Sequence, residues 1–156
     1  MLGKLEESRK QYVEQIRRAG KSFTEIKFLK TIPGIGEIQA AKIVAQVVDP
    51  KRFPNKYKYF SYCGLVRHPR ESGGKSYGTT KILGNRILKS VYKMAGRSAL
   101  RGDSGLRELY DRLRAKGVSD HNAYNAVCRK IAAVSLSLWR HHQKYNDKII
   151  TGGLIK

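Results

Sequence analysis

A short turn of proline and glycine between two apolar stretches restricts the fold of this chain more than any other feature. Residues 33–36 are Pro-Gly-Ile-Gly, and they follow a stretch, residues 23–32, whose apolar spacing predicts a helix. Proline and glycine interrupt helices, so the next helix must double back on the first. We expect Ile35 to insert into the core, while Ala40 and Ala41 allow the two helices to approach closely.

Such a turn has the form of a helix-hairpin-helix, a motif suited to holding a phosphate. Gly34 and Gly36 leave no side chain between an anion and the amides at the start of the following helix, where the helix dipole also favours negative charge. Lys42 is placed to add a contact one turn later. These three residues are therefore predicted to bind a nucleic-acid backbone without reading its sequence. The alternative is a tight turn that binds no ligand.

The charge of the chain favours the first interpretation. Among 156 residues, 32 are Lys or Arg and 12 are Asp or Glu, which gives a formal charge of +20. A foldable chain with this balance is typical of nucleic-acid binding, because phosphate contacts dominate such affinities. No apolar run has membrane-spanning length and no signal-peptide core opens the chain. We therefore expect a soluble intracellular protein with no membrane partner.

The remaining apolar spacing predicts a mainly α fold. A charged helix over residues 2–18, ended by Gly20, is either the seam of a short coiled coil or an ordinary amphipathic helix. We assign residues 1–20 to this helix, 21–146 to one compact helical domain that contains the hairpin, and 147–156 to a flexible tail. The long final helix is expected to run from residue 120 to about 145, with Arg129, Lys130 and Arg140 exposed.

A glycine-rich basic loop over residues 64–78 holds the candidate chemistry. It contains Ser72 and Ser76, and a serine hydroxyl becomes a nucleophile on phosphorus when a base activates it. The bland alternative is a basic loop whose serines only touch the DNA backbone. Residues 65–66 and 76–77 are expected to form a small β-hairpin around the loop, and His68 is the nearest histidine to Ser72.

A basic stripe follows the serine loop. The helix predicted over residues 85–100 places its apolar residues, including Ile87 and Met94, inward. Its cations recur at helical spacing beside those of the loop and form a predicted phosphate-binding face: Lys75, Lys81, Arg86, Lys89 and Lys93. Acids are scarce and isolated, so the chain is not expected to hold the carboxylate cluster of a two-metal nuclease. No Cys or His spacing suits zinc, and Cys63 and Cys128 are expected to be reduced core residues.

The order of these motifs resembles one family. The motifs of this chain are, in order, Ile32-Pro33-Gly34-Ile35-Gly36, Gly64-Leu65 with Pro69, Ser72-Gly73, Gly84-Asn85-Arg86, and Ala126-Val127-Cys128-Arg129-Lys130. In this order the motifs resemble the C-terminal transposase domain of the serine-using insertion-sequence transposases, which carry a RuvC-like DEDD domain in front and are guided by a bridge RNA. The resemblance covers roughly residues 25–145.

The resemblance implies a recombinase mechanism. Ser72 matches the serine that attacks DNA and forms a covalent phosphoserine link, although Glu71 stands where many members have a second serine. The implied partners are DNA, a bridge RNA, a RuvC-like domain and further copies of the chain, and the implied location is the prokaryotic cytoplasm, in association with the nucleoid. The resemblance places Mg²⁺ on acids of the RuvC-like domain, so no cofactor is expected in this chain. The sequence leaves open a second function, a helix-hairpin-helix module that binds nucleic acid without catalysis.

Overall fold

The 22-residue helix α7 (Asp120–His141) is the element around which the other helices pack. It begins where the Ser119 hydroxyl accepts a hydrogen bond from the Asn122 amide, and it ends at His141, after which His142 adopts the left-handed conformation. Helices α2, α4, α5 and α6 all contact it. Because neighbours cover most of its circumference, α7 carries eleven buried residues, including Val127, Ile131 and Trp139.

The protein is represented by a computed structural model that describes residues 1–79 and 83–151. In chain order the helices are α1 (Leu2–Gly20), α2 (Thr24–Leu29), α3 (Glu37–Val47), the 3-10 helix η1 (Pro50–Arg52), α4 (Lys56–Tyr62), α5 (Arg86–Ala99), α6 (Gly105–Ala115), α7 and α8 (Lys148–Thr151). The strands β1 (Pro69–Ser72) and β2 (Lys75–Thr79) form an antiparallel pair. The predicted mainly helical fold is confirmed.

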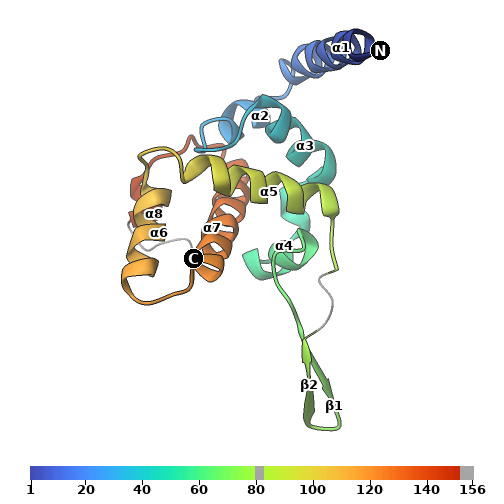
Figure 1. Cartoon of the computed structure of the whole chain (residues 1–156). Helices are drawn as coiled ribbons and strands as arrows, with labels where there is room; N and C mark the ends of the chain where they lie inside the picture. The colour runs from blue at the N-terminus through green and yellow to red at the C-terminus, as the bar shows by residue number, and fades with distance from the viewer. Residues whose placement is uncertain (80–82, 152–156) are drawn as a thin grey trace.

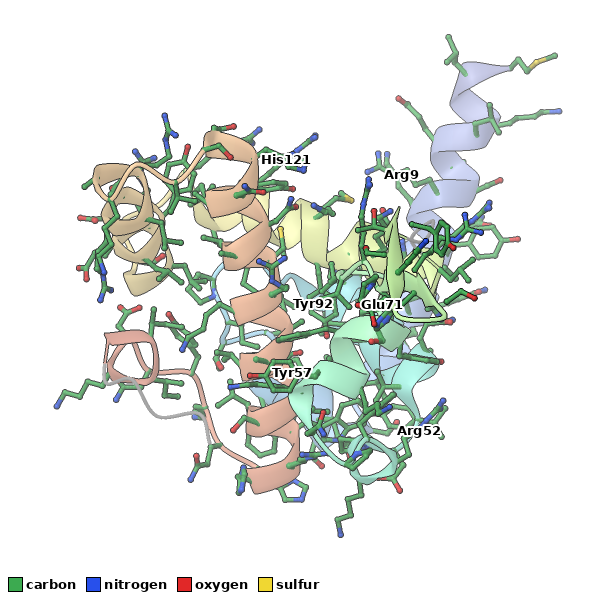
Figure 2. The ribbon with its side chains drawn as sticks, turned by 90° about the horizontal axis from the view of Figure 1, so that it is seen from below. Arg9, Arg52, Tyr57, Glu71, Tyr92 and His121 are labelled. Atoms are coloured by element: carbon green, nitrogen blue, oxygen red, sulfur yellow. The ribbon has the colours of Figure 1, made fainter. Side chains whose placement is uncertain are left out.

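A chain of buried hydroxyl groups ties α4, α5 and α7 together. The Tyr59 and Tyr92 hydroxyls lie 2.5 Å apart, and the Tyr92 hydroxyl is 2.7 Å from Ser135 Oγ, which donates to the Ala132 carbonyl. Figure 2 shows Tyr92 inside the helical body. Burial raises the pKa of both tyrosines, so they remain neutral hydrogen-bonding groups. These hydrogen bonds give each buried hydroxyl group a partner, and an unpaired hydroxyl would destabilise the core.

Helix α1 and the β1–β2 hairpin project from the helical body, whereas α8 packs against it. Helix α1 projects from one end, and the β1–β2 hairpin projects from another as an arm (Figure 1). Leu2 and Leu5 on α1 are exposed, and the coiled-coil interpretation of this helix stays a prediction. At the other terminus, α8 lies where the sequence predicted a flexible tail. Ile150 is buried, and the Asp147 carboxylate accepts a hydrogen bond from the Gly105 amide at 2.9 Å.

Several details of the sequence prediction are wrong. Ile87 and Met94 are 46% and 56% exposed, because α7 and α3 cover the other faces of α5. Helix α7 ends at His141 and not near residue 145. Arg140, expected on the surface, is half-buried and donates hydrogen bonds to the carbonyls of Pro50 and Phe53. It therefore joins α7 to the segment that precedes α4.

Candidate nucleic-acid interface and serine arm

The serine arm is the β1–β2 hairpin, and its turn explains two of the glycines. Gly73 and Gly74 form the two-residue loop, with φ of +57° and +76°. Two central residues with positive φ are the pattern of a type I′ turn, which matches the twist of a hairpin. The predicted hairpin exists, but its strands are Pro69–Ser72 and Lys75–Thr79; Leu65 and Val66 lie outside it. The arm is exposed over its whole length.

The register of the arm distinguishes its two serines. Ser72 lies directly opposite Lys75, whereas Ser76 lies opposite Glu71. Directly opposed residues on one face of an antiparallel pair have Cβ atoms about 5 Å apart. Successive residues alternate between faces, so Ser72 shares a face with a cation and Ser76 shares the other face with a carboxylate. The first face therefore carries a positive charge beside its serine, and the second carries a negative charge.

The strand conformation keeps His68 away from Ser72. Three residues of extended chain, from Pro69 to Ser72, span roughly 10 Å, and His68 lies beyond Pro69. The imidazole is therefore out of hydrogen-bond reach of the Ser72 hydroxyl within the arm. An activating base for Ser72 is not supplied by this histidine in the conformation described.

Two glycines fix the base of the arm. A Cβ added at Gly84 would lie 2.6 Å from the Gly64 amide nitrogen and 2.8 Å from the Ser61 carbonyl oxygen. The two chain segments that enter and leave the arm can therefore come this close only because residue 84 has no Cβ. Asn85 then holds the crossing: its amide donates to the Tyr62 carbonyl at 2.7 Å. Its side chain caps α5 by accepting from the Leu88 amide and donates to Gln46. The Gly84-Asn85 motif therefore anchors the arm.

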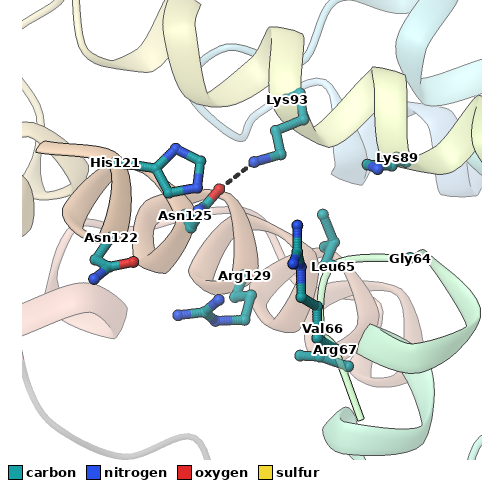
Figure 3. A pocket seen from close by; sticks show the side chains of 10 residues that line it. All are labelled: Gly64, Leu65, Val66, Arg67, Lys89, Lys93, His121, Asn122, Asn125 and Arg129. Atoms are coloured by element: carbon teal, nitrogen blue, oxygen red, sulfur yellow. Dashed lines mark hydrogen bonds between the residues drawn. The ribbon is translucent and has the colours of Figure 1, made fainter. Parts of the chain in front are cut away.

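A cleft of about 760 Å³ opens beside this anchor, between α5 and the first half of α7. Lys89 and Lys93 lie on α5, Asn125 and Arg129 lie on α7, and the segment that leads into the arm contributes Arg67 (Figure 3). His121 lies at the far end, where a second hollow continues past Arg97. The structure thus brings together two of the predicted phosphate-binding residues, Lys89 and Lys93.

Lys93 is held in place within the cleft. Its ammonium group donates to the Asn125 side chain and lies 4.9 Å from the centroid of the Tyr124 ring. The Tyr124 hydroxyl in turn donates to the Lys93 carbonyl at 2.5 Å. The pKa of Lys93 is lowered, first by burial and then by the nearby cations of Lys89, Arg129 and Arg97, with the Cys128 thiol acting in the opposite direction.

The predicted phosphate-binding residues Gly34, Gly36 and Lys42 do not line this cleft. Gly34 has a packing role that the sequence did not indicate. Gly34 has φ of +87°, and a Cβ there would lie 2.2 Å from the Ala95 carbonyl oxygen. Close packing against α5 therefore requires this glycine. Gly36 donates its amide to the Gln39 side chain at 3.1 Å, and Lys42 is exposed on α3. Binding of phosphate by these three residues stays a prediction.

The carboxylate of Glu37 occupies the start of α3. It lies 3.4 Å from Arg17 Nε and 3.5 Å from Lys30 Nζ. An acid at a helix N-terminus is favourable, but a phosphate at this turn would have to displace it from the same dipole. Of the other predicted residues, Arg86 is exposed at the start of α5 and Lys75 lies on the arm, while Lys81 lies outside the described residues.

The sequence prediction missed the α7 side of the cleft. His121, Asn125 and Arg129 recur every four residues, which places them on one face of a helix that is otherwise mainly buried. That polar stripe could have been found from the sequence. Arg67 could not, because only the crossing at Gly64 and Gly84 directs its segment toward the cleft.

The described part of the chain holds no group of three or more His, Cys, Asp or Glu side chains able to ligate a metal. The described residues therefore offer no ligand set for the Mg²⁺ ion that the family resemblance assigns to a RuvC-like domain. Likewise, within residues 1–79 and 83–151 no helix is long and apolar enough to cross a membrane. Cys63 and Cys128 are both buried as free thiols, as predicted.

Comparison with known proteins agrees with this architecture. The model of the transposase IS116/IS110/IS902 family matches residues 26–111. The chain is 29% identical over 125 residues to the insertion element IS110 uncharacterized 43.6 kDa protein of Streptomyces coelicolor, covering 80% of this chain and 31% of that protein. It is 25% identical over 138 residues to the insertion element IS116 uncharacterized 44.8 kDa protein of Streptomyces clavuligerus, covering 87% and 34%.

A third relative is described as a transposase. The transposase for insertion sequence element IS1111A of Coxiella burnetii is 28% identical over 92 residues, covering 58% of this chain and 25% of that protein. The chain thus spans about a third or less of the length of the curated relatives it matches.

Proposed function

The chain belongs to the IS116/IS110/IS902 family of transposases, and from that membership we propose that it binds DNA and supplies Ser72 as the nucleophile for strand cleavage and exchange. The cross-strand pairing of Ser72 with Lys75 carries this assignment. It puts a hydroxyl and an ammonium group side by side at the tip of an exposed arm, where a phosphodiester can reach both. Ser76, opposite Glu71, lacks that advantage.

The proposed reaction is a transesterification. The Ser72 Oγ attacks phosphorus, the bond from phosphorus to one deoxyribose oxygen breaks, and that oxygen leaves with the electron pair. The serine proton passes to a base and the leaving oxygen takes up a proton, so a covalent phosphoserine link and a free DNA hydroxyl result. The same number of phosphoester bonds exists before and after, so the link can be reversed onto another strand without an energy-rich cofactor. Lys75 stabilises the negative charge that builds on the phosphate oxygens.

The shape of the arm bears on the proposed partners. It projects from the helical body, so the groups that activate Ser72 must approach from outside that body (Figure 1). We propose that a RuvC-like domain, of the same or another chain, supplies them in a composite site. A bridge RNA and self-association through α1 belong to the same proposal, and the exposed Leu2, Leu5 and Tyr12 suit such an association. The proposed place of action is the DNA of a bacterial cytoplasm.

A second function, nucleic-acid binding without catalysis, has one observation in its favour. The strand conformation keeps His68 out of reach of Ser72, and the described residues hold no group of three or more His, Cys, Asp or Glu side chains able to bind a metal ion. Under this alternative the arm and the cleft bind nucleic acid, and Ser72 only contacts a phosphate. The two functions differ in what loss of the hydroxyl does.

Substitution of Ser72 separates them. In a protein that combines this chain with the proposed RuvC-like domain, Ser72→Ala should abolish strand transfer. The dissociation constant for DNA should change less than about twofold, because one neutral hydroxyl contributes little beside the phosphate charges. Ser76→Ala, on the opposite face of the same strand pair, is the matched control and should retain strand transfer. Equal loss of DNA binding and strand transfer in Ser72→Ala would favour the binding module.

A further inference from the structure

We propose that the cleft between α5 and α7 is a binding site for a nucleic-acid backbone phosphate, distinct from the phosphate attacked at the arm. The inference rests on the proposed function, since it assumes that the chain binds nucleic acid. Its seven polar members are Arg67, Lys89, Lys93, His121, Asn122, Asn125 and Arg129. They come from three separate segments that the fold brings together around one hollow (Figure 3).

The charge in this cleft is unbalanced. None of the ten described residues that line it is acidic, and four of them are Lys or Arg. Elsewhere in the protein, cations do pair with acids, as Arg17 does with Glu37 and Arg107 does with Asp111. The cations that line the cleft have no acid among their fellow lining residues. Cations gathered without an acid repel one another unless an anion is bound between them.

Lys93 indicates that this repulsion acts in the folded protein. Burial and then neighbouring cations lower its pKa, although the Asn125 side chain and the Tyr124 ring both hold the ammonium group. The negatively charged oxygens of a backbone phosphate beside Lys93 would oppose both effects. The fixed position of Lys93 also reduces the entropy lost when it binds a ligand.

The chemistry of the lining fits a backbone phosphate better than a base. Arginine and lysine side chains recognise phosphate oxygens, and the amide of Asn125 adds a polar neighbour. His121 is the only ring among the described lining residues, and it lies at the end of the cleft, so no platform for base stacking is formed. The site should therefore hold nucleic acid without selecting a sequence.

The position of the cleft relates it to Ser72. Ser72 lies five positions after Arg67, and five steps of extended chain span at most about 17 Å. Successive phosphates of one strand rise by about 3.4 Å, so a strand lying in the cleft presents to Ser72 a phosphate no more than about five nucleotides away. The cleft would fix the strand while the arm reaches the bond to be cleaved.

The salt dependence of binding tests this proposal. Anisotropy titrations would use a labelled 30-base-pair DNA duplex and an RNA stem-loop of equal charge, between 50 and 200 mM salt. Each lost phosphate contact reduces the slope of log K against log salt by about 0.9 for duplex DNA. Arg67→Gln with Arg129→Gln should therefore reduce it by about 2, and Lys93→Gln by about 1. A reduced slope with DNA alone, with RNA alone or with both would identify the nucleic acid that occupies the cleft.

The matched control is Lys51→Gln with Lys144→Gln, which removes the same charge from exposed positions outside the cleft. Lys144 lies beyond the C-terminal end of α7, which is about 30 Å long. Thermal melting of every variant checks the fold, and Arg67, on an exposed segment, provides a variant with no packing role. If the cleft variants match the control, the cleft inference is overturned and the proposed function stands. If the wild type shows no salt-dependent binding to either nucleic acid, both fail.

Discussion

The substitution Gly34→Ala tests whether this glycine serves packing or phosphate binding. An alanine there must hold φ of +87°, which costs roughly 1–2 kcal/mol for a residue with a Cβ. The new methyl group would also lie 2.2 Å from the Ala95 carbonyl oxygen and 3.1 Å from the Ala99 amide nitrogen. Both neighbours are backbone atoms of α5, so the turn between α2 and α3 must move away from α5, at a cost of about 1–3 kcal/mol for overpacking.

The total, about 3 kcal/mol, should lower the midpoint of thermal unfolding by roughly 6–12 °C in a chain of this size. Circular dichroism melting measures it. Gly73→Ala is the matched control, since Gly73 also has positive φ but nothing lies within 4 Å of its added Cβ. Strain in the exposed arm should be relieved by local fraying and move the global midpoint by less than about 2 °C. A Gly34→Ala variant that melts like the wild type, yet binds DNA poorly, would refute the packing argument.

Two further predictions concern stability. Arg140→Met removes the guanidinium hydrogen bonds to the Pro50 and Phe53 carbonyls and should lower the free energy of unfolding by about 2–3 kcal/mol in urea titrations; Lys144→Met should change it by less than about 0.5 kcal/mol. Burial raises the pKa of the Cys63 thiol to about 12 from 9.0. Because the unfolded thiol loses its proton first, its contribution to stability is lost between about pH 9 and 12, by about 1–2 kcal/mol at pH 10. Cys63→Ala should show a smaller fall between pH 8 and 10, and an equal fall would contradict this cause.

The order of helices could be predicted because apolar spacing and glycine or proline breaks act locally. The break between α2 and α3, the buried Ile35 and the buried face of α7 all follow from such local patterns. The inward prediction for Ile87 and Met94 was wrong because helical spacing alone could not give the limits of the buried face. Which part of an apolar stripe is covered depends on where α3 and α7 cross α5.

The candidate site could be predicted only in part for a related reason. Ser72 stood out through its glycines, and Lys89 and Lys93 through their spacing on one helix. The pairing of Ser72 with Lys75 depends on strand register, which the two-glycine turn fixes and which the sequence prediction placed wrongly. The cleft depends on the contact between Gly64 and Gly84, a tertiary approach that no local pattern specifies.

The most direct measurement of the proposed function is a trap for covalent protein–DNA adducts. The chain would be mixed with nicked or branched DNA and Mg²⁺, with and without a separately supplied RuvC-like domain, and analysed on a denaturing gel. The account predicts a shifted band that requires the added domain, persists in Ser76→Ala and disappears in Ser72→Ala. A band that survives Ser72→Ala, or no band in any mixture despite salt-sensitive DNA binding, would contradict the assignment of Ser72 as the nucleophile.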